Sequence, residues 1–261
     1  MRKIKILGTL ACFVIMEACS TVPITGRRQL NLANSDQIQQ EAAQAYRQFL
    51  SDPKTKVVSS GSDVQRVRTV GNRIARAIET FLSQNGQANQ YNFQWEFNVV
   101  QSKEINAWCM PGGKVAVYTG ILPVTQTDAG LATVMGHEIA HAIARHSEER
   151  YSQTAGAQAL GGIVGAATGS QTVSQLYGLG GQLALLKYGR NQESEADRLG
   201  LIFMAMAGYN PESAVSFWQR MASSKEGNGA PPEFLSTHPS DQTRIANIQK
   251  RLPEAKQYYK P

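Results

Sequence analysis

Hydrophobic and polar positions alternate along the chain with periods that distinguish helices from strands. Apolar residues recur every three or four positions from Val64 to Leu82, which is typical of one buried helix face. The more polar residues 35–50 predict a surface helix. Another helical pattern begins at Thr127 or Asp128, either of which can cap it, and continues to about His146.

Between these helices the period changes to two. Aromatic and apolar residues occupy alternate positions from Phe93 to Val99, which predicts a half-buried strand. Residues 105–109 and 114–119 predict two more short strands, and Pro111-Gly112-Gly113 predicts a turn between them. The simplest interpretation is a small sheet of two or three antiparallel strands.

Three further helices are expected over residues 192–207, 211–224 and 240–252. Before them, residues 155–181 are rich in Gly, Ala and Ser and fit either two closely packed helices or a mobile cover over the cleft. The polar residues in this stretch leave no apolar run of about 20 residues, so a transmembrane hairpin is excluded. The pattern as a whole predicts an α+β fold that is mainly helical.

The N-terminus has the composition of a targeting segment. A basic start is followed by an apolar stretch too short to span a membrane, so we expect a signal peptide over residues 1–18. Cys19 follows small residues in an arrangement that resembles a bacterial lipobox and is the candidate lipidation site. Simple secretion and an uncleaved anchor are the alternatives. We expect residues 19–34 to form a lipidated tether and residues 35–261 to form a single domain.

Charge and cysteine content narrow the class of protein further. The 261 residues carry a net charge of +6, of which residues 1–18 supply about a third. No segment is dense enough in Lys and Arg to bind nucleic acid, so we exclude DNA and RNA as partners. Of the three cysteines only Cys109 lies in the body of the chain, which predicts a buried thiol rather than a disulfide or a nucleophile.

The strongest chemical signal is His137-Glu138-x-x-His141 within a predicted helix. Positions i and i+4 share one helix face, so both imidazoles can bind the same metal ion. Zinc suits such a site because it accepts nitrogen ligands in tetrahedral geometry and keeps a position open for water. Glu138 is then the candidate catalytic base that removes a proton from that water.

A second predicted helix supplies the remaining acidic groups. Glu193 and Asp197 are again four positions apart, so Glu193 can complete the metal ligands while Asp197 accepts a hydrogen bond from a ligand histidine. The alternative is an ordinary exposed helix with two histidines. The apolar, Ala-rich surroundings of His137 argue against it, because a buried cluster without a metal would be costly.

These motifs, together with Thr237-His238-Pro239, resemble those of one zinc-metallopeptidase family. It includes the type I CAAX-prenyl proteases and the HtpX-like and Oma-like proteases, and the similarity covers roughly residues 60–252. The resemblance implies a gluzincin-type zincin with a small, mostly antiparallel sheet beside the HExxH helix, and one Zn²⁺ per chain. The lipobox-like start is nearest to the bacterial periplasmic or outer-membrane lipoprotein branch, which implies a periplasm-facing protein of the cell envelope.

The resemblance also implies roles for residues near the end of the chain. His238 would lie near the metal, where it either stabilises the oxyanion or occupies the open metal position; the alternative is a loop residue that caps the next helix. Arg244 would approach the cleft as a further catalytic residue. We expect His146 to be only a helix-end cation, and Glu195 to be solvated or paired with Arg198.

The segment Asn106 to Gly113 resembles the family's strand and turn beside the cleft. An extended peptide can add to the edge of such a strand through main-chain hydrogen bonds. The candidate residues for this contact are Asn106, Ala107, Trp108 and Cys109. Recognition of this kind selects weakly for sequence and suits unfolded or misassembled polypeptides.

The expected function is therefore a zinc-dependent endopeptidase that acts on damaged or misassembled envelope proteins. Its expected partners are polypeptide substrates, the membrane through the lipid anchor, and the envelope assembly machinery. The alternatives are a proteolytically silent assembly factor or chaperone and an aminopeptidase or other zinc hydrolase. Glu138 favours an enzyme, because a structural zinc site needs no base, and the strand edge favours internal cleavage.

Overall fold

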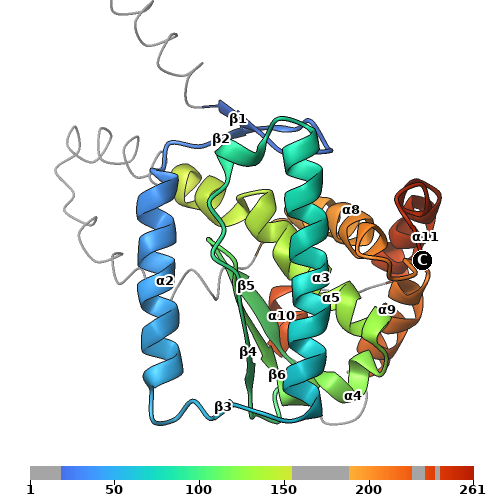
Figure 1. Cartoon of the computed structure of the whole chain (residues 1–261). Helices are drawn as coiled ribbons and strands as arrows, with labels where there is room; N and C mark the ends of the chain where they lie inside the picture. The colour runs from blue at the N-terminus through green and yellow to red at the C-terminus, as the bar shows by residue number, and fades with distance from the viewer. Residues whose placement is uncertain (1–18, 155–187, 225–232, 239–241) are drawn as a thin grey trace, which may run out of the picture.

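The computed structural model describes residues 19–154, 188–224, 233–238 and 242–261 (Figure 1). The signal peptide expected over residues 1–18 and the Gly-rich stretch 155–181 lie outside the described residues. Within the described ranges, no helix combines the length and the apolar character needed to cross a membrane.

The described part of the chain is mainly helical, with a small sheet, as expected for a gluzincin. The helices are α2 (Ser35–Ser51), α3 (Ser62–Gln84), α4 (Leu122–Thr125), α5 (Asp128–Ile143), α8 (Arg190–Met206), α9 (Ser213–Ser223), α10 (Glu233–Thr237) and α11 (Gln242–Lys256). The strands are β1 (Cys19–Thr21), β2 (Arg28–Leu30), β3 (Val57–Val58), β4 (Glu96–Val100), β5 (Ala107–Met110) and β6 (Lys114–Tyr118). Residues 146–154 are also helical. The helices and strands predicted within the described residues are confirmed to within a few residues at their ends.

The larger sheet has the strand order β3-β4-β6-β5. The β3–β4 and β5–β6 pairs are antiparallel, whereas β4 and β6 are parallel, with Phe97 opposite Val115. The sheet is thus mostly antiparallel. The expectation of antiparallel strands alone is wrong for the β4–β6 pair. The tight turn at Gly112 and Gly113, which both have positive φ, reverses the chain between β5 and β6. Because β6 lies between β4 and β5, it also pairs with β4, which runs in the same direction.

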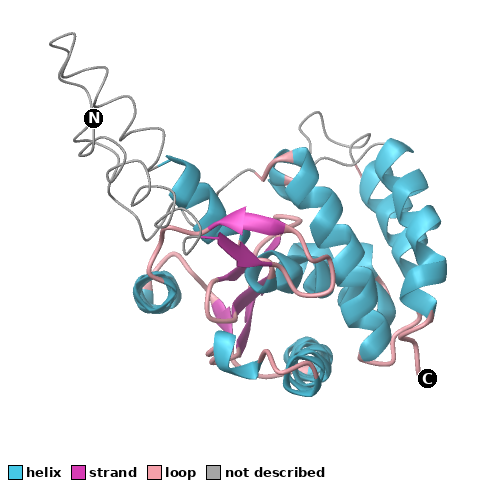
Figure 2. Ribbon diagram, turned by 90° about the horizontal axis from the view of Figure 1, so that it is seen from above, coloured by secondary structure: helices cyan, strands magenta, loops and turns pink. Residues whose placement is uncertain are grey.

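Helices cover both faces of this sheet (Figure 2). Side chains of β5 alternate between the two faces: Trp108 packs with Tyr46 of α2, and Cys109 lies in the main core with α5. The Tyr46 hydroxyl also donates a hydrogen bond to the carbonyl of Val115, at 2.6 Å. Helix α2, which the sequence predicts as a surface helix, therefore packs on one face of the sheet and is part of the fold.

Helix α5 is the centre of the molecule and packs against α3, β5, α8 and α9 (Figure 1). Its first turn is capped by Thr127, whose hydroxyl accepts a hydrogen bond from the backbone N–H of Gly130. It approaches α8 closely, because a Cβ on Gly200 would lie 2.9 Å from the backbone nitrogen of His137. The two motif helices are thereby held against each other.

Helix α5 ends earlier than its sequence pattern predicts. The last residue of α5 is Ile143, and Arg145 adopts a positive φ of 52° before a new helix begins at His146. The N-terminal residues 19–34 contain the β1–β2 strand pair and contact both this new helix and α8, for example where the backbone N–H of Leu32 donates to Ser152 Oγ. The division into tether and domain remains a prediction.

Candidate metal centre

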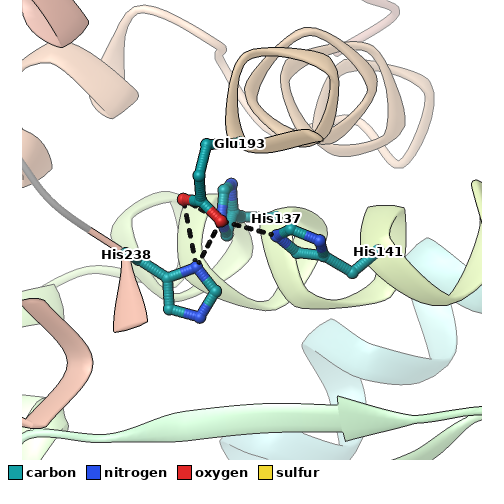
Figure 3. A group of neighbouring side chains, drawn as sticks. All are labelled: His137, His141, Glu193 and His238. Carbon is teal, nitrogen blue, oxygen red and sulfur yellow. Dashed lines mark hydrogen bonds and ion pairs between the residues drawn. The ribbon is translucent and has the colours of Figure 1, made fainter. Parts of the chain in front are cut away.

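Four buried side chains from three helical segments converge at one point (Figure 3). His137 and His141 project from successive turns of α5, and Glu193 reaches them from the first turn of α8. His238 enters directly after α10 (Figure 3). The predicted ligands His137, His141 and Glu193 are thus brought together, and His238 joins them.

The spacing of the four donor atoms fits a tetrahedral metal ion. His137 Nε2 lies 3.2 Å from both His141 Nε2 and His238 Nδ1. The Glu193 carboxylate oxygens lie 3.0–3.5 Å from the nearest nitrogens of the three histidines. A tetrahedral zinc site with metal–nitrogen distances of about 2.0–2.1 Å would separate its donor atoms by about 3.3 Å. The residues present therefore fit zinc, and His238 is a fourth donor group, beside His137 and Glu193.

Glu138 lies beside this cluster and is almost fully buried. Its Oε1 atom makes no hydrogen bond to any described residue and lies 3.6 Å from His238 Nε2. Burial raises the pKa of Glu138 to about 7, while the His238 imidazole opposes that rise. A buried carboxylate with a free oxygen at a metal site is the arrangement that a catalytic base requires.

Asp197 holds the outer side of His137. Its Oδ1 atom lies 3.0 Å from His137 Nδ1, and Arg244 donates two hydrogen bonds to the Asp197 carboxylate, at 2.7 and 2.9 Å. Burial alone would raise the pKa of Asp197, but the charge of Arg244 and the hydrogen bond from His137 hold it below its ordinary value. The Arg244 guanidinium also lies 3.2 Å from Glu193 and stacks on Trp218. Arg244 therefore contacts the predicted ligand Glu193 as well as Asp197, the carboxylate behind His137.

Two expectations about neighbouring residues are wrong. His146 is completely buried, with Nδ1 only 2.8 Å from His141 Nδ1, so it is not an exposed helix-end cation. Glu195 is paired with His146 and Arg27, whereas Arg198 pairs with Glu254. The break in the helix after Ile143 brings His146 against His141. Neither the motif spacing nor the helix periodicity predicts this contact.

Tyr188 is a further neighbour of the centre that had no assigned role. Its ring stacks on His141 with centroids 3.8 Å apart and an interplanar angle of 17°. Its hydroxyl is 2.9 Å from Ser147 Oγ. In the sequence, Tyr188 is distinguished only by its position shortly before Glu193, and this position does not predict a contact with α5.

The candidate substrate strand lies at one end of the described sheet, next to α5. The four residues Asn106, Ala107, Trp108 and Cys109 are all buried. At the start of this strand the backbone N–H of Phe234 in α10 donates to the carbonyl of Ile105, at 3.2 Å. Burial raises the pKa of the Cys109 thiol well above its usual value, which agrees with the predicted inert side chain. A contact between this strand and substrate remains a prediction.

The sequence profile of Peptidase family M48 matches residues 65–252. Mitochondrial metalloendopeptidase OMA1 of Schizosaccharomyces pombe is 34% identical over 242 residues, which are 90% of this chain and 66% of that protein. Mitochondrial metalloendopeptidase OMA1 of Homo sapiens is 30% identical over 252 residues, 89% of this chain and 46% of the relative. Beta-barrel assembly-enhancing protease of Escherichia coli is 28% identical over 173 residues, 63% of this chain and 36% of the relative.

This chain spans less than two thirds of the length of each of these relatives. The matched region nevertheless contains all four residues of the cluster, together with Glu138 and Asp197. Because the profile covers well over half of the sequence and the geometry of its motifs is intact, the chain belongs to peptidase family M48.

Proposed function

We propose that this chain is a zinc-dependent endopeptidase, with His137, His141 and Glu193 as metal ligands and Glu138 as general base. The observation that carries the proposal is the set of four buried donor groups whose ligand atoms lie within 4.8 Å of one another, with a Glu138 oxygen beside it that makes no hydrogen bond to a described residue. A purely structural zinc site has no use for that carboxylate. Its burial would be costly without a compensating role.

Zinc bound at this centre would polarise the scissile carbonyl and make a water molecule more acidic. Glu138 would accept a proton from a water molecule at this centre and later donate it to the leaving amine. Asp197 keeps His137 in the tautomer that presents Nε2 to the metal, because Nδ1–H donates to its carboxylate. Arg244 holds Asp197 in place through its two hydrogen bonds.

His238 is the candidate gate of this site. Its Nδ1 atom is 3.0 Å from Glu193 Oε1 and 3.2 Å from His137 Nε2, so it fills the position that water and substrate need. This placement supports the fourth-ligand role over the oxyanion role for the conformation described. The enzyme is therefore silent until His238 withdraws, after which an extended peptide can lie along β5.

The proposed substrates are unfolded, damaged or misassembled proteins of the bacterial cell envelope. Support comes from a relative that is named as a β-barrel assembly-enhancing protease and from the lipobox-like sequence at Cys19. Lipidation of Cys19 would hold the enzyme on the outer membrane, facing the periplasm and close to the envelope assembly machinery. The relatives named as mitochondrial endopeptidases support internal cleavage over removal of terminal residues.

The test compares the full chain with Glu138→Gln, using a reduced, unfolded test protein as substrate and measuring the zinc content of both. Glu138→Gln preserves the size of the side chain and leaves all four metal-facing atoms in place. We expect both proteins to bind one zinc ion and only the parent to produce internal fragments. If the parent binds zinc and never cleaves, even after His238→Ala, the assembly-factor function replaces this proposal.

A further inference from the structure

A second histidine lies directly behind one of the metal ligands. His146 Nδ1 is 2.8 Å from His141 Nδ1, and His146 Nε2 is 3.0 Å from Glu195 Oε2. His146 is fully buried and Glu195 nearly so. A continuous chain of hydrogen bonds thus runs from the outer nitrogen of a ligand, through a neutral imidazole, to a carboxylate.

Only one arrangement of protons satisfies both contacts. His141 presents Nε2 to the cluster, so its Nδ1 carries the proton and donates to His146 Nδ1. The proton of His146 is then on Nε2 and is donated to Glu195. The contacts of each ring therefore define its tautomer, as is usual for histidines that surround a metal.

The backbone conformation between Ile143 and His146 makes the contact of His146 with His141 possible. On a continuous helix, position i+5 is rotated by about 140° from position i, so His146 would point away from His141. The chain instead leaves α5 after Ile143 and passes through the positive φ of Arg145 before the next helix begins. This turn brings the His146 ring to the outer edge of His141.

Glu195, the carboxylate at the end of this series of hydrogen bonds, is held by the N-terminal segment, residues 19–34. Thr25 Oγ1 donates to Glu195 Oε1 at 2.6 Å, and Arg27 Nε donates to Oε2 at 2.7 Å. Arg27 also forms an ion pair with Glu149 at 2.7 Å, and Glu149 in turn accepts a hydrogen bond from Gln192. Both oxygens of Glu195 are thereby held, so the carboxylate that orients His146 cannot rotate freely.

We propose that His146 and Glu195 are positioning residues for the ligand His141, and that Thr25 and Arg27 make the N-terminal segment a structural part of the metal centre. The two ligand histidines would then be oriented by two different carboxylates of α8. Asp197 acts on His137 directly, and Glu195 acts on His141 through His146. The inference rests on the proposed zinc site, but its principal test needs no peptidase activity.

The test measures zinc affinity by competition with a chromogenic chelator, using the full chain and the variants His146→Ala, Glu195→Ala and Arg27→Ala. Loss of a group that orients a ligand weakens metal binding by about 10–100-fold. We expect a loss of this size for the first two variants and a smaller loss for Arg27→Ala. The absorption spectrum of the cobalt-loaded protein should change with His146→Ala, because it reports the geometry of the ligands themselves.

Conservative variants separate positioning from simple destabilisation. His146→Gln and Glu195→Gln each retain an oxygen that can accept the required hydrogen bond, so they should recover much of the lost affinity. Glu148→Gln is the matched control. Glu148 is a buried carboxylate on the same helix as His146, and it accepts hydrogen bonds from Asn31 and Ser35. The substitution should lower the melting temperature of the metal-free protein without changing zinc affinity.

Two outcomes overturn the inference: zinc affinity unchanged in His146→Ala and Glu195→Ala, or an equal loss of affinity in Glu148→Gln. A parent protein that binds zinc without cleaving any substrate would contradict the proposed peptidase function. In that case the chelator competition still decides whether His146 and Glu195 position His141.

Discussion

The Oδ1 atom of Asp197 lies 3.0 Å from Nδ1 of His137, on the opposite side of the imidazole ring from the metal-facing Nε2. Arg244 donates to both oxygens of the same carboxylate. The proposed ligand His137 of α5 thus contacts a carboxylate of α8, and that carboxylate is held by Arg244 of α11. Three helices must be assembled before the centre can bind a metal ion with its full affinity.

Asp197→Ala should therefore weaken zinc binding by about 10–100-fold, the usual effect of removing a carboxylate behind a ligand histidine. The substitution also leaves Arg244 buried without its main partner, so the melting temperature of the metal-free protein should fall. Chelator competition measures the first effect and thermal unfolding the second. Glu254→Gln removes the carboxylate that pairs with Arg198 on the partly exposed side of α8, and should leave zinc affinity unchanged.

His238→Ala should increase the rate of peptide cleavage several-fold while it weakens zinc binding. The reason is that His238 Nδ1 is a fourth donor atom, beside His137 and Glu193, where water and substrate must enter. The neighbouring variant Thr237→Ala, which removes only a hydroxyl that donates to the Phe234 carbonyl, should behave like the parent. A fall in cleavage rate with His238→Ala would instead favour the role in oxyanion stabilisation.

The grouping of these side chains could be predicted from the sequence, because each pair is set by helix periodicity alone. His137 with His141, and Glu193 with Asp197, are four positions apart on helices whose patterns are unambiguous. The two helices face each other because Gly136 and Gly200 allow close approach, which a sequence without structure does not reveal. The spacing along each helix thus identifies the pair of residues that this helix contributes, and the packing of α5 against α8 brings the two pairs together.

The contacts of His146 and Glu195 could not be predicted, because they join segments that are distant in the sequence. The position of His146 requires a break after α5 that includes a positive φ at Arg145, a residue type that gives no signal for such a conformation. Glu195 is held by Thr25 and Arg27, about 170 positions earlier in the chain. The parallel β4–β6 pairing was missed for the same reason, since it joins strands that are not consecutive.

Gly200→Ala should destabilise the protein and weaken metal binding together. The new Cβ would lie 2.9–3.0 Å from backbone atoms of Gly136 and His137, which cannot move aside as a flexible side chain can. Overpacking of this kind costs about 1–3 kcal/mol in the free energy of unfolding, which denaturant titration of the metal-free protein can measure. Because the displaced backbone carries His137, zinc affinity should also fall.

Arg190→Ala, at an exposed position in the first turn of the same helix, is the control for this comparison. It should change the free energy of unfolding by no more than about 0.5 kcal/mol. Unchanged stability and zinc affinity in Gly200→Ala would show that α5 and α8 can separate without disturbing the centre.

Cys109 should resist alkylation in the folded protein, because burial raises the pKa of its thiol and keeps the reactive thiolate scarce. The measurement requires Cys12→Ser and Cys19→Ser, which leave Cys109 as the single thiol of the chain. Iodoacetamide should then modify the protein rapidly in guanidinium chloride and at least about 100-fold more slowly in buffer, in proportion to the small population of unfolded chains. Rapid modification of the folded protein would mean that β5 opens to solvent, and the strand proposed to bind substrate would then be mobile rather than preformed.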